Sequence, residues 1–190
     1  MRKKITIFPS GFTLFEVIIT LAIMIVVFSL AISEIKTTNS RSNLTLTTEN
    51  LVSDLRTTVM SALNSETLQL KTPTSWGVYF STGSTASTYT IFADLNSDGS
   101  YNSNEKFKTI TLASNLSIPC VSVGISSCVS PATVLFNVPN AKPTLAGGST
   151  DPGNIIVQLE DLASPAQPSD PTNRAIKEIS INPLGVISFK

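Results

Sequence analysis

Residues 12–32 read FTLFEVIITLAIMIVVFSLAI, and these positions carry a single charge, Glu16. As a helix rising about 1.5 Å per residue, the segment would span roughly 30 Å, the thickness of the hydrocarbon core of a bilayer. Arg2, Lys3 and Lys4 precede it. Basic residues stay on the cytoplasmic side of a membrane segment, so we expect a cytoplasmic N-terminus and an exported part at 36–190.

The apolar segment has three interpretations. A secretory signal peptide could be cut near Ser29, Ala31 or Ser33, but its apolar core is usually only about 7–15 residues long. A plain membrane anchor explains the length of the segment but not Glu16, because a carboxylate inside a spanning helix is costly and usually functional. The third interpretation comes from the residues around Gly11.

The stretch Gly11–Val17 reads GFTLFEV. It resembles the type IV prepilin signature Gly-Phe-Thr-Leu-(Ile/Leu)-Glu-Val, with Phe15 in place of the usual aliphatic residue. The resemblance implies an α+β, pilin-like fold: a long N-terminal helix, transmembrane in its first half, packed on an antiparallel β-sheet head. It also implies that a prepilin peptidase cuts between Gly11 and Phe12 on the cytoplasmic face, and that Phe12 is then N-methylated.

Glu16 would be the fifth residue of the mature chain. The cut creates an α-amine on Phe12 that is largely cationic, because the ordinary pKa of such a group is about 7.7–8.0. A lone carboxylate and a lone ammonium are both costly in an apolar bundle, so we expect Glu16 to meet the Phe12 amine of a neighbouring subunit during filament assembly. The alternative is that Glu16 favours the positive end of its own helix, a contribution of about 0.3–1 kcal/mol.

Residues 36–71 are polar but carry one apolar stripe at helical spacing. The stripe consists of Leu44, Leu51, Leu55, Val59 and Leu63, widened by Val52 and Ala62. No Pro or Gly occurs from Phe12 to Lys71, so one long helix is predicted over this range, with Pro73 marking its stop. The chain therefore divides into a leader at 1–11, a transmembrane and filament-core helix at 12–35, an amphipathic helix at 36–71 and a β-rich head at 72–190.

The head is predicted to be an antiparallel sheet system, because short β-like runs alternate with turn-rich pieces. The runs are Trp76–Thr82, Thr88–Asp94, Lys106–Leu112, Leu116–Val123, Thr133–Val138, Asn154–Glu160, Ala175–Asn182 and Val186–Phe189. The stretches 139–153 and 163–173 are predicted to be exposed loops. Residues 179–189 predict a terminal hairpin with Pro183 and Gly185 in its turn. This hairpin resembles the C-terminal hairpin of the H-type pseudopilins of type II secretion and of related minor pilins.

Residues 94–105 read DLNSDGSYNSNE and match the calcium-loop pattern D-x-[DN]-x-[DN]-G-x5-E at every position. The predicted oxygen ligands are Asp94, Asn96, Asp98, the Ser100 carbonyl, Asn102 through water and bidentate Glu105, with Gly99 at the sharp turn. The sequence thus predicts a Ca²⁺ site between two strands. The alternative is a polar hairpin loop, because Asp, Asn, Ser and Gly are also turn residues.

Cys120 and Cys128 are the two cysteines of the chain. In an exported head we expect them to form a disulfide, whose short loop would contribute roughly 2–3 kcal/mol. The alternative is a pair of free thiols. The chain has no histidine, which excludes His-based catalytic triads and His-ligated metal sites. No nucleophile–base constellation stands out, so no enzymatic activity is predicted.

The 190-residue chain carries 13 basic and 13 acidic residues, without a polybasic stretch that would indicate nucleic-acid binding. The sequence predicts a minor pilin or pseudopilin, a structural subunit of a type IV pilus or a type II secretion pseudopilus. Its expected partners are other pilin or pseudopilin subunits, prepilin peptidase and the inner membrane, with the head periplasmic or extracellular.

Two alternatives stay open. One is a DNA-binding or adhesive minor pilin used in DNA uptake, although only Arg174, Lys177 and Lys190 are basic near the C-terminus. The other is a secreted calcium-binding β-domain released after Ala31.

Overall fold

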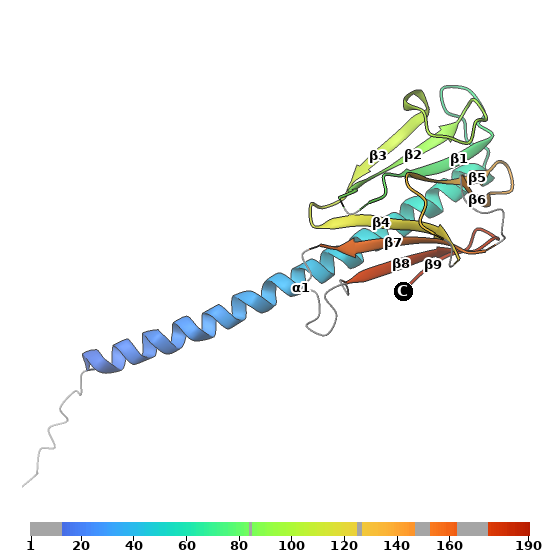
Figure 1. The fold of residues 1–190 in the computed structure, drawn as a ribbon. Helices are drawn as coiled ribbons and strands as arrows, with labels where there is room; N and C mark the ends of the chain where they lie inside the picture. The colour runs from blue at the N-terminus through green and yellow to red at the C-terminus, as the bar shows by residue number, and fades with distance from the viewer. Residues whose placement is uncertain (1–12, 84, 125–126, 147–152, 163–174) are drawn as a thin grey trace, which may run out of the picture. The chain divides into compact units, whose positions relative to one another are not determined.

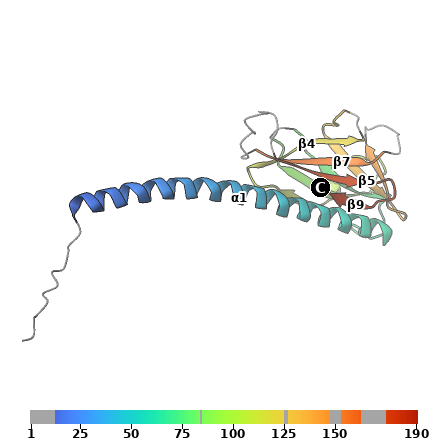
Figure 2. The ribbon, with the colours of Figure 1, turned by 90° about the horizontal axis from the view of Figure 1, so that it is seen from below.

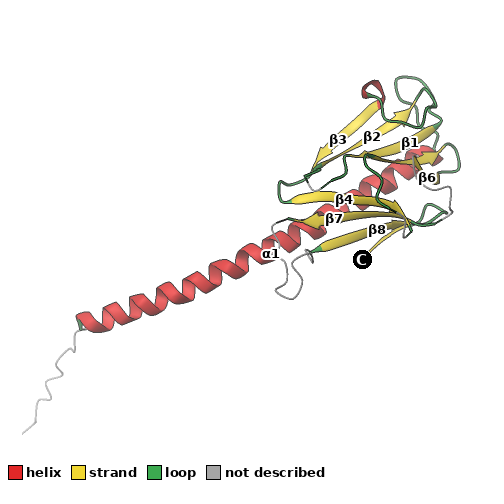
Figure 3. Cartoon of the chain, in the orientation of Figure 1, coloured by secondary structure: helices red, strands yellow, loops and turns green. Residues whose placement is uncertain are grey.

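The computed structural model describes residues 13–83, 85–124, 127–146, 153–162 and 175–190, and leaves the side chains of residues 30–40 undescribed. The chain forms two compact units, Met1–Asn39 and Ser40–Lys190. The described residues form one α-helix, nine β-strands and one short 3-10 helix (Figures 1 and 3). The predicted α+β fold, with an N-terminal helix packed against antiparallel sheets, is confirmed.

The helix α1 spans Leu14–Leu63. Thr13 caps its start, because the hydroxyl and the carbonyl of Thr13 both accept the N–H of Glu16, at 3.3 and 3.1 Å. In the first unit, the large apolar side chains from Leu14 to Phe28 are between 41% and 81% exposed. Within the residues that the structure describes, no helical segment has the length and hydropathy needed to cross a membrane.

The end of α1 corrects the prediction of a helix through Lys71. The N–H of Glu66 donates to the carbonyl of Ser61 at 3.0 Å, and the N–H of Ser65 donates to the carbonyl of Ala62 at 3.2 Å. The two bonds form a Schellman motif, with Ser65 in its left-handed position at a φ of 51°. Glycine usually takes that position, so with serine there nothing in the sequence marks this helix end.

The larger sheet has five antiparallel strands in the order β3-β2-β1-β5-β6. Their bounds are β1 Ser75–Phe80, β2 Thr88–Asp94, β3 Lys106–Thr111, β5 Ala132–Asn137 and β6 Lys142–Ala146. Strand β6 lies in the stretch 139–153 that was expected to be an exposed loop, so that prediction is wrong for this part. Pro143 of β6 pairs with Phe136, and a proline is tolerated there because β6 is an edge strand.

The smaller sheet has four antiparallel strands in the order β4-β7-β8-β9. Their bounds are β4 Leu116–Val123, β7 Ile155–Asp161, β8 Ile176–Ile181 and β9 Ile187–Phe189. Strands β8 and β9 form the predicted terminal hairpin: the N–H of Asn182 donates to the carbonyl of Val186 at 3.0 Å, and Gly185 has a φ of 80° that suits glycine. All eight predicted strands are confirmed, with ends shifted by at most two residues. The predicted loop 163–173 lies outside the described residues.

In the second unit, α1 packs one face against both sheets, and Figure 2 shows this part of the helix running along the strands. The buried helix residues that join the core are Leu44, Leu51, Val52, Leu55 and Ala62. Val59 packs against this core and is partly buried. Leu63, by contrast, is 46% exposed, which corrects its predicted place in the stripe. It is the last residue of the helix, where the chain turns away in the Schellman motif.

One polar cluster connects α1 to the larger sheet. The Tyr89 hydroxyl on β2 donates to Asp54 Oδ2 at 2.8 Å, and Lys108 Nζ on β3 lies 3.2 Å from Asp54 Oδ1. Burial, and then the hydrogen bond to Asp54 and its charge, raise the pKa of Tyr89 above the ordinary value of about 10. The folded protein therefore holds Tyr89 in its neutral form.

We predict that alkaline unfolding is coupled to Tyr89. Up to about pH 10 the folded and unfolded chains both keep the hydroxyl proton, so its stabilising contribution is fully present. At higher pH the unfolded chain releases the proton and the folded chain retains it, so stability falls as the pH rises. Tyrosinate absorbance and Trp76 fluorescence, titrated in parallel, should show Tyr89 ionising only as the fold is lost, and Tyr89→Phe should remove that step. Reversible ionisation of Tyr89 in a protein with unchanged Trp76 fluorescence would contradict the prediction.

Candidate functional site

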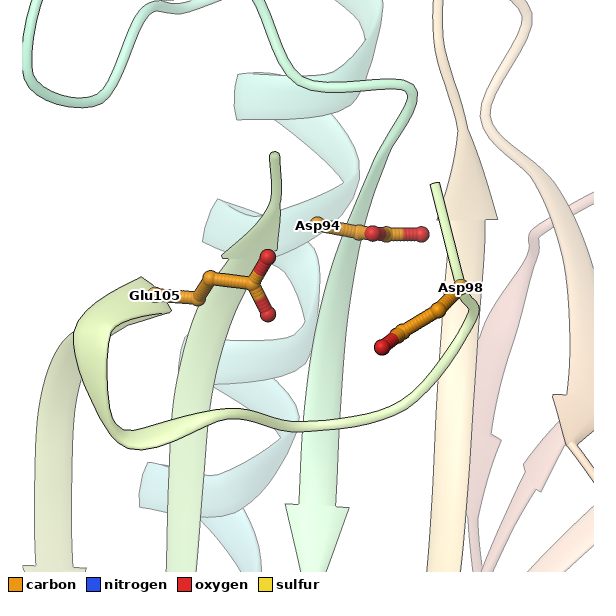
Figure 4. A group of neighbouring side chains, drawn as sticks. All are labelled: Asp94, Asp98 and Glu105. Carbon is orange, nitrogen blue, oxygen red and sulfur yellow. The ribbon is translucent and has the colours of Figure 1, made fainter. Parts of the chain in front are cut away.

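The loop between β2 and β3 brings three carboxylates together. Asp94 is the last residue of β2, and Glu105 ends the 3-10 helix Ser103–Glu105, directly before β3. A carboxylate oxygen from each of Asp94, Asp98 and Glu105 lies within 4.8 Å of the other two. Figure 4 shows the three side chains pointing toward one space enclosed by the loop.

Asp94 is buried, and both of its carboxylate oxygens accept hydrogen bonds. Oδ1 accepts the N–H of Ser97 at 2.7 Å, and Oδ2 accepts the N–H of Gly99 at 3.1 Å. The hydroxyls of Thr74 and Ser75 donate to Oδ2 at 3.4 and 3.3 Å. These two hydroxyls lie 20 and 19 positions before Asp94, outside the calcium-loop pattern, and the sequence analysis missed them.

Glu105 is completely buried. Its Oε1 accepts the N–H groups of Leu95 and Asn96 at 3.0 and 3.2 Å, and its Oε2 accepts the side-chain amide of Asn102 at 3.3 Å. A carboxylate is retained in a buried place when hydrogen bonds of this kind offset its desolvation. Glu105 therefore ties the first residues of the loop to its last residue.

Asp98 is the exposed member of the group. Its Oδ1 accepts the N–H of Ser100 at 2.7 Å, and its Oδ2 accepts the side-chain amides of Asn102 and Asn96 at 3.0 and 2.8 Å. These bonds, led by that from Ser100, hold the pKa of Asp98 below its ordinary range, so the carboxylate is charged at neutral pH. Its contribution to stability is present above the ordinary pKa of about 3.9, and it is lost as the pH falls through the lowered value.

The remaining predicted ligands, Asn96, Ser100 and Asn102, are hydrogen-bonded to the carboxylates of the loop. Asn96 Oδ1 accepts the N–H of Asp98 at 3.1 Å, and the carbonyl of Ser100 lies 3.5 Å from Asn102 Nδ2. Because the oxygen and nitrogen of an amide exchange places by rotation, both asparagines can turn an oxygen toward a cation. The structure thus brings the three predicted carboxylates together, and the other three predicted ligand residues lie in the same loop.

The charge of the loop favours a cation. The ion pairs found among the described residues join Lys108 to Asp54 and Lys190 to Glu178, and neither includes a carboxylate of the loop. Three carboxylates so close together repel one another unless positive charge lies between them. The group Asp94, Asp98 and Glu105 could therefore hold a metal ion.

Aromatic packing seats the loop on the larger sheet. The ring of Tyr101 lies 5.1 Å from that of Tyr79 and 5.5 Å from that of Phe92. Gly99 has a φ of 69°, the conformation that the predicted sharp turn requires of glycine. The carboxylates thus sit on a loop whose backbone is fixed from both sides, by the sheet and by its own hydrogen bonds.

The predicted disulfide is confirmed. Cys120 on β4 and Cys128 are bonded, with their Cα atoms 5.2 Å apart. The N–H of Val129 donates to the carbonyl of Val121 at 2.8 Å, so the chain after Cys128 returns along β4.

The N-terminal signature is only partly described. Gly11 and Phe12 lie outside the described residues, whereas Glu16 lies in the first turn of α1 and is exposed. Within the described part of the chain, no hydrogen bond or ion pair reaches the Glu16 carboxylate. This position is compatible with both roles considered for Glu16, pairing with a neighbour or favouring the positive helix end.

Substitution of Glu105 should show how much the loop depends on this carboxylate. Glu105→Ala removes a completely buried side chain and takes the acceptor from the N–H groups of the half-buried Leu95 and the exposed Asn96, which should lower the free energy of unfolding by about 1–3 kcal/mol. Glu105→Gln keeps an acceptor oxygen, so it should lower the free energy of unfolding by less than Glu105→Ala does. Urea unfolding in chelator, followed by Trp76 fluorescence, measures both, with exposed Ser103→Ala as the matched control. A Glu105→Ala protein as stable as the wild type would refute this role.

Comparison with known proteins adds no relative to these observations. No family model, no curated protein and no solved structure matches the chain.

Proposed function

We propose that this chain is a structural subunit of a type IV pilin-like filament, a minor pilin or pseudopilin, with its head outside the cytoplasm. The observation that carries the proposal is the GFTLFEV stretch at Gly11–Val17, which leads into α1 and into an apolar run that continues to Ile32. A 50-residue helix whose later part packs on antiparallel sheets agrees with the architecture that the prepilin resemblance implies.

The first part of α1 supports the proposed location. Its apolar side chains from Leu14 to Phe28 are exposed, including residues on every side of the helix. Leaving such a surface in water costs about 25 cal/mol for each Å². In our proposal this segment lies in the inner membrane before assembly and among the helices of other subunits afterwards.

Glu16 has a defined role in this proposal. After the cut at Gly11, its carboxylate pairs with the cationic Phe12 amine of a neighbouring subunit and sets the axial register between them. Within the described part of the chain this carboxylate has no bonding partner, so it is available to pair with the amine of a neighbour. Moving the two charges from water into an apolar bundle carries a large desolvation penalty, which their mutual attraction offsets only when they form a pair.

Two features of the head support the subclass and the compartment. The β8–β9 hairpin has the form expected from the resemblance to H-type pseudopilins and related minor pilins. The Cys120–Cys128 bond is typical of proteins exported to an oxidising compartment. We propose a structural role in the filament for this head, and no enzymatic one.

We further propose that the cation of the β2–β3 loop is Ca²⁺. All of its potential ligands are oxygens: three carboxylates, two amides and the Ser100 carbonyl. Ca²⁺ accepts six to eight such ligands in flexible geometry, whereas Mg²⁺ prefers a compact octahedral site that retains water. Bound there, the ion would join the end of β2 to the start of β3.

Processing is the direct test of the filament proposal. Co-expression with a prepilin peptidase should yield a mature chain that begins at N-methylated Phe12, as read by intact mass and N-terminal sequencing. Gly11→Leu should block the cut, because a bulky side chain replaces the residue whose bare backbone enters the protease. Ser10→Ala, which changes the neighbouring leader residue, should leave it intact.

The contrary outcome is equally specific. A mature chain that begins at Ile32, Ser33 or Glu34 would identify a secreted domain and would defeat the proposal.

Calcium should raise the melting temperature of the full-length protein in detergent. A ligand that binds only the folded state adds about 2.7 kcal/mol at one hundred times its Kd. Sites in extracellular modules often have Kd values of roughly 10⁻⁴ to 10⁻³ M, so millimolar calcium is needed. Asp98→Asn should abolish most of the shift, because it removes the exposed carboxylate of the site.

The matched control removes a carboxylate elsewhere. Glu49→Gln changes an exposed residue of α1 and should leave the calcium shift unchanged. If neither calorimetry nor melting responds to calcium up to about 10 mM, on the order of ten times the weak limit for such sites, the loop is a polar turn only.

A further inference from the structure

A tight turn after α1 presents an exposed leucine in an unfavourable conformation. Leu68 and Lys71 exchange backbone N–H···O bonds in both directions, each 3.0 Å long. The two residues between them, Gln69 and Leu70, have φ values of 53° and 63°. Turns with positive φ at both positions normally hold Asn-Gly, because other side chains strain the backbone there. Leu70 is also 98% exposed, so it gains nothing from burial within its own chain.

Contacts from two directions hold this turn beside the start of β3. Gln69 Nε2 donates to the carbonyl of Asn104 at 3.1 Å. Trp76 Nε1 donates to the carbonyl of Glu66 at 3.3 Å, and the Trp76 ring meets the Phe107 ring edge-on at 5.5 Å between centroids. Leu70 is therefore presented on an ordered turn, which lowers the entropy lost when a partner covers it.

The exposed part of the turn combines an apolar side chain with a basic one. Lys71 directly follows Leu70 in the chain and is also exposed. Among the described residues, Lys71 makes no ion pair. Leu70 and Lys71 form what we name the turn patch. A complementary surface would offer an apolar side chain with a carboxylate beside it.

The exposed side of α1 offers that combination. Leu46, Glu49, Asn50 and Ser53 follow at helical spacings of three, four and seven, so they lie on one side of the helix. All four are exposed, with Leu46 at 54%, and they alternate with the buried stripe that contains Leu44 and Leu51. Glu49 makes no ion pair within the described part of the chain. These four residues form what we name the acceptor face.

The two surfaces of one molecule lie too far apart to meet. Leu46 is about 25 Å along α1 from Leu63, at 1.5 Å per residue, and the turn patch follows that end of the helix. We propose that the turn patch of one copy docks on the acceptor face of a second copy, with Leu70 against Leu46 and Lys71 beside Glu49. Because the two surfaces differ, the contact is heterologous, and it forms wherever two copies of this chain are neighbours. The inference rests on the proposed filament function and names one contact between neighbouring heads.

Cross-linking of the full-length chain in membranes tests this contact. Leu70→Cys is placed in one tagged copy and Leu46→Cys in a differently tagged copy, with the native cysteines already joined as Cys120–Cys128. A short bis-maleimide should join the two variants when they are co-expressed, and neither variant alone should cross-link to the same extent. Trp76 fluorescence of the purified proteins checks that both variants are folded.

Charge reversal tests the Lys71–Glu49 pair independently. Lys71→Glu or Glu49→Lys alone should lower the yield of the mixed cross-link about two- to fivefold, the effect of a charge pair at a solvent-exposed rim. The two reversals together, one in each copy, should restore the yield. Lys142→Glu makes the same charge change at an exposed position of β6 and should have no effect.

The outcomes separate this inference from the filament proposal. The contact is overturned if Leu70→Cys cross-links to itself as well as to Leu46→Cys. It is also overturned if a chain correctly processed at Phe12 gives no mixed cross-link. Neither result affects the proposed function. If each charge reversal alone lowers the yield of the mixed cross-link but the two together do not restore it, Lys71 and Glu49 do not form a pair. A mixed cross-link with charge rescue in a chain that is never cut at Gly11 supports the contact while the filament proposal fails.

Discussion

The head depends on one requirement: a single face of α1 must fill the space against both sheets. Leu51 and Leu55 are completely buried in that face, and burial of each contributes about 1.5–3 kcal/mol. Their spacing fixes the rotation of the helix, which in turn places Asp54 where it meets Tyr89 and Lys108. The apolar contacts thus provide most of the stabilisation, and the polar cluster selects one register of helix on sheet.

The carboxylate loop depends on the same two strands that carry this cluster. Strand β2 brings Tyr89 to the helix and ends in Asp94, while β3 brings Lys108 to the helix and begins directly after Glu105. The register of β2 with β3 shifts between Ile91 and Phe92, close to the loop. Helix packing therefore fixes the two strand ends whose separation decides whether the carboxylates can share a cation.

The sequence was informative where local chemistry determines structure. Strands β2 and β4 have the predicted bounds, and the twelve-residue pattern of the loop identified all three clustered carboxylates. It was uninformative where tertiary contacts override local preference. Ser65 ends the helix in a conformation that usually signals glycine, and Pro143 lies in a strand because an edge needs no donor there. Thr74 and Ser75 support Asp94 only because β1 pairs with β2, a relation between distant residues that no local pattern contains.

Among the strands that the structure describes, β3 is an edge of the larger sheet and pairs with β2 alone, so its outer backbone groups could recruit a strand from another molecule. Lys106 lies opposite Phe92 and Lys108 opposite Ile91. Since successive residues of β2 point to opposite faces, the edge carries one lysine on each face. Lys108 is paired with Asp54, whereas Lys106 makes no ion pair among the described residues, so a strand added at this edge would have to desolvate the Lys106 charge, which would oppose uncontrolled aggregation. Crowded heads are thus discouraged from adding a strand here, although no described strand pairs with the outer side of β3.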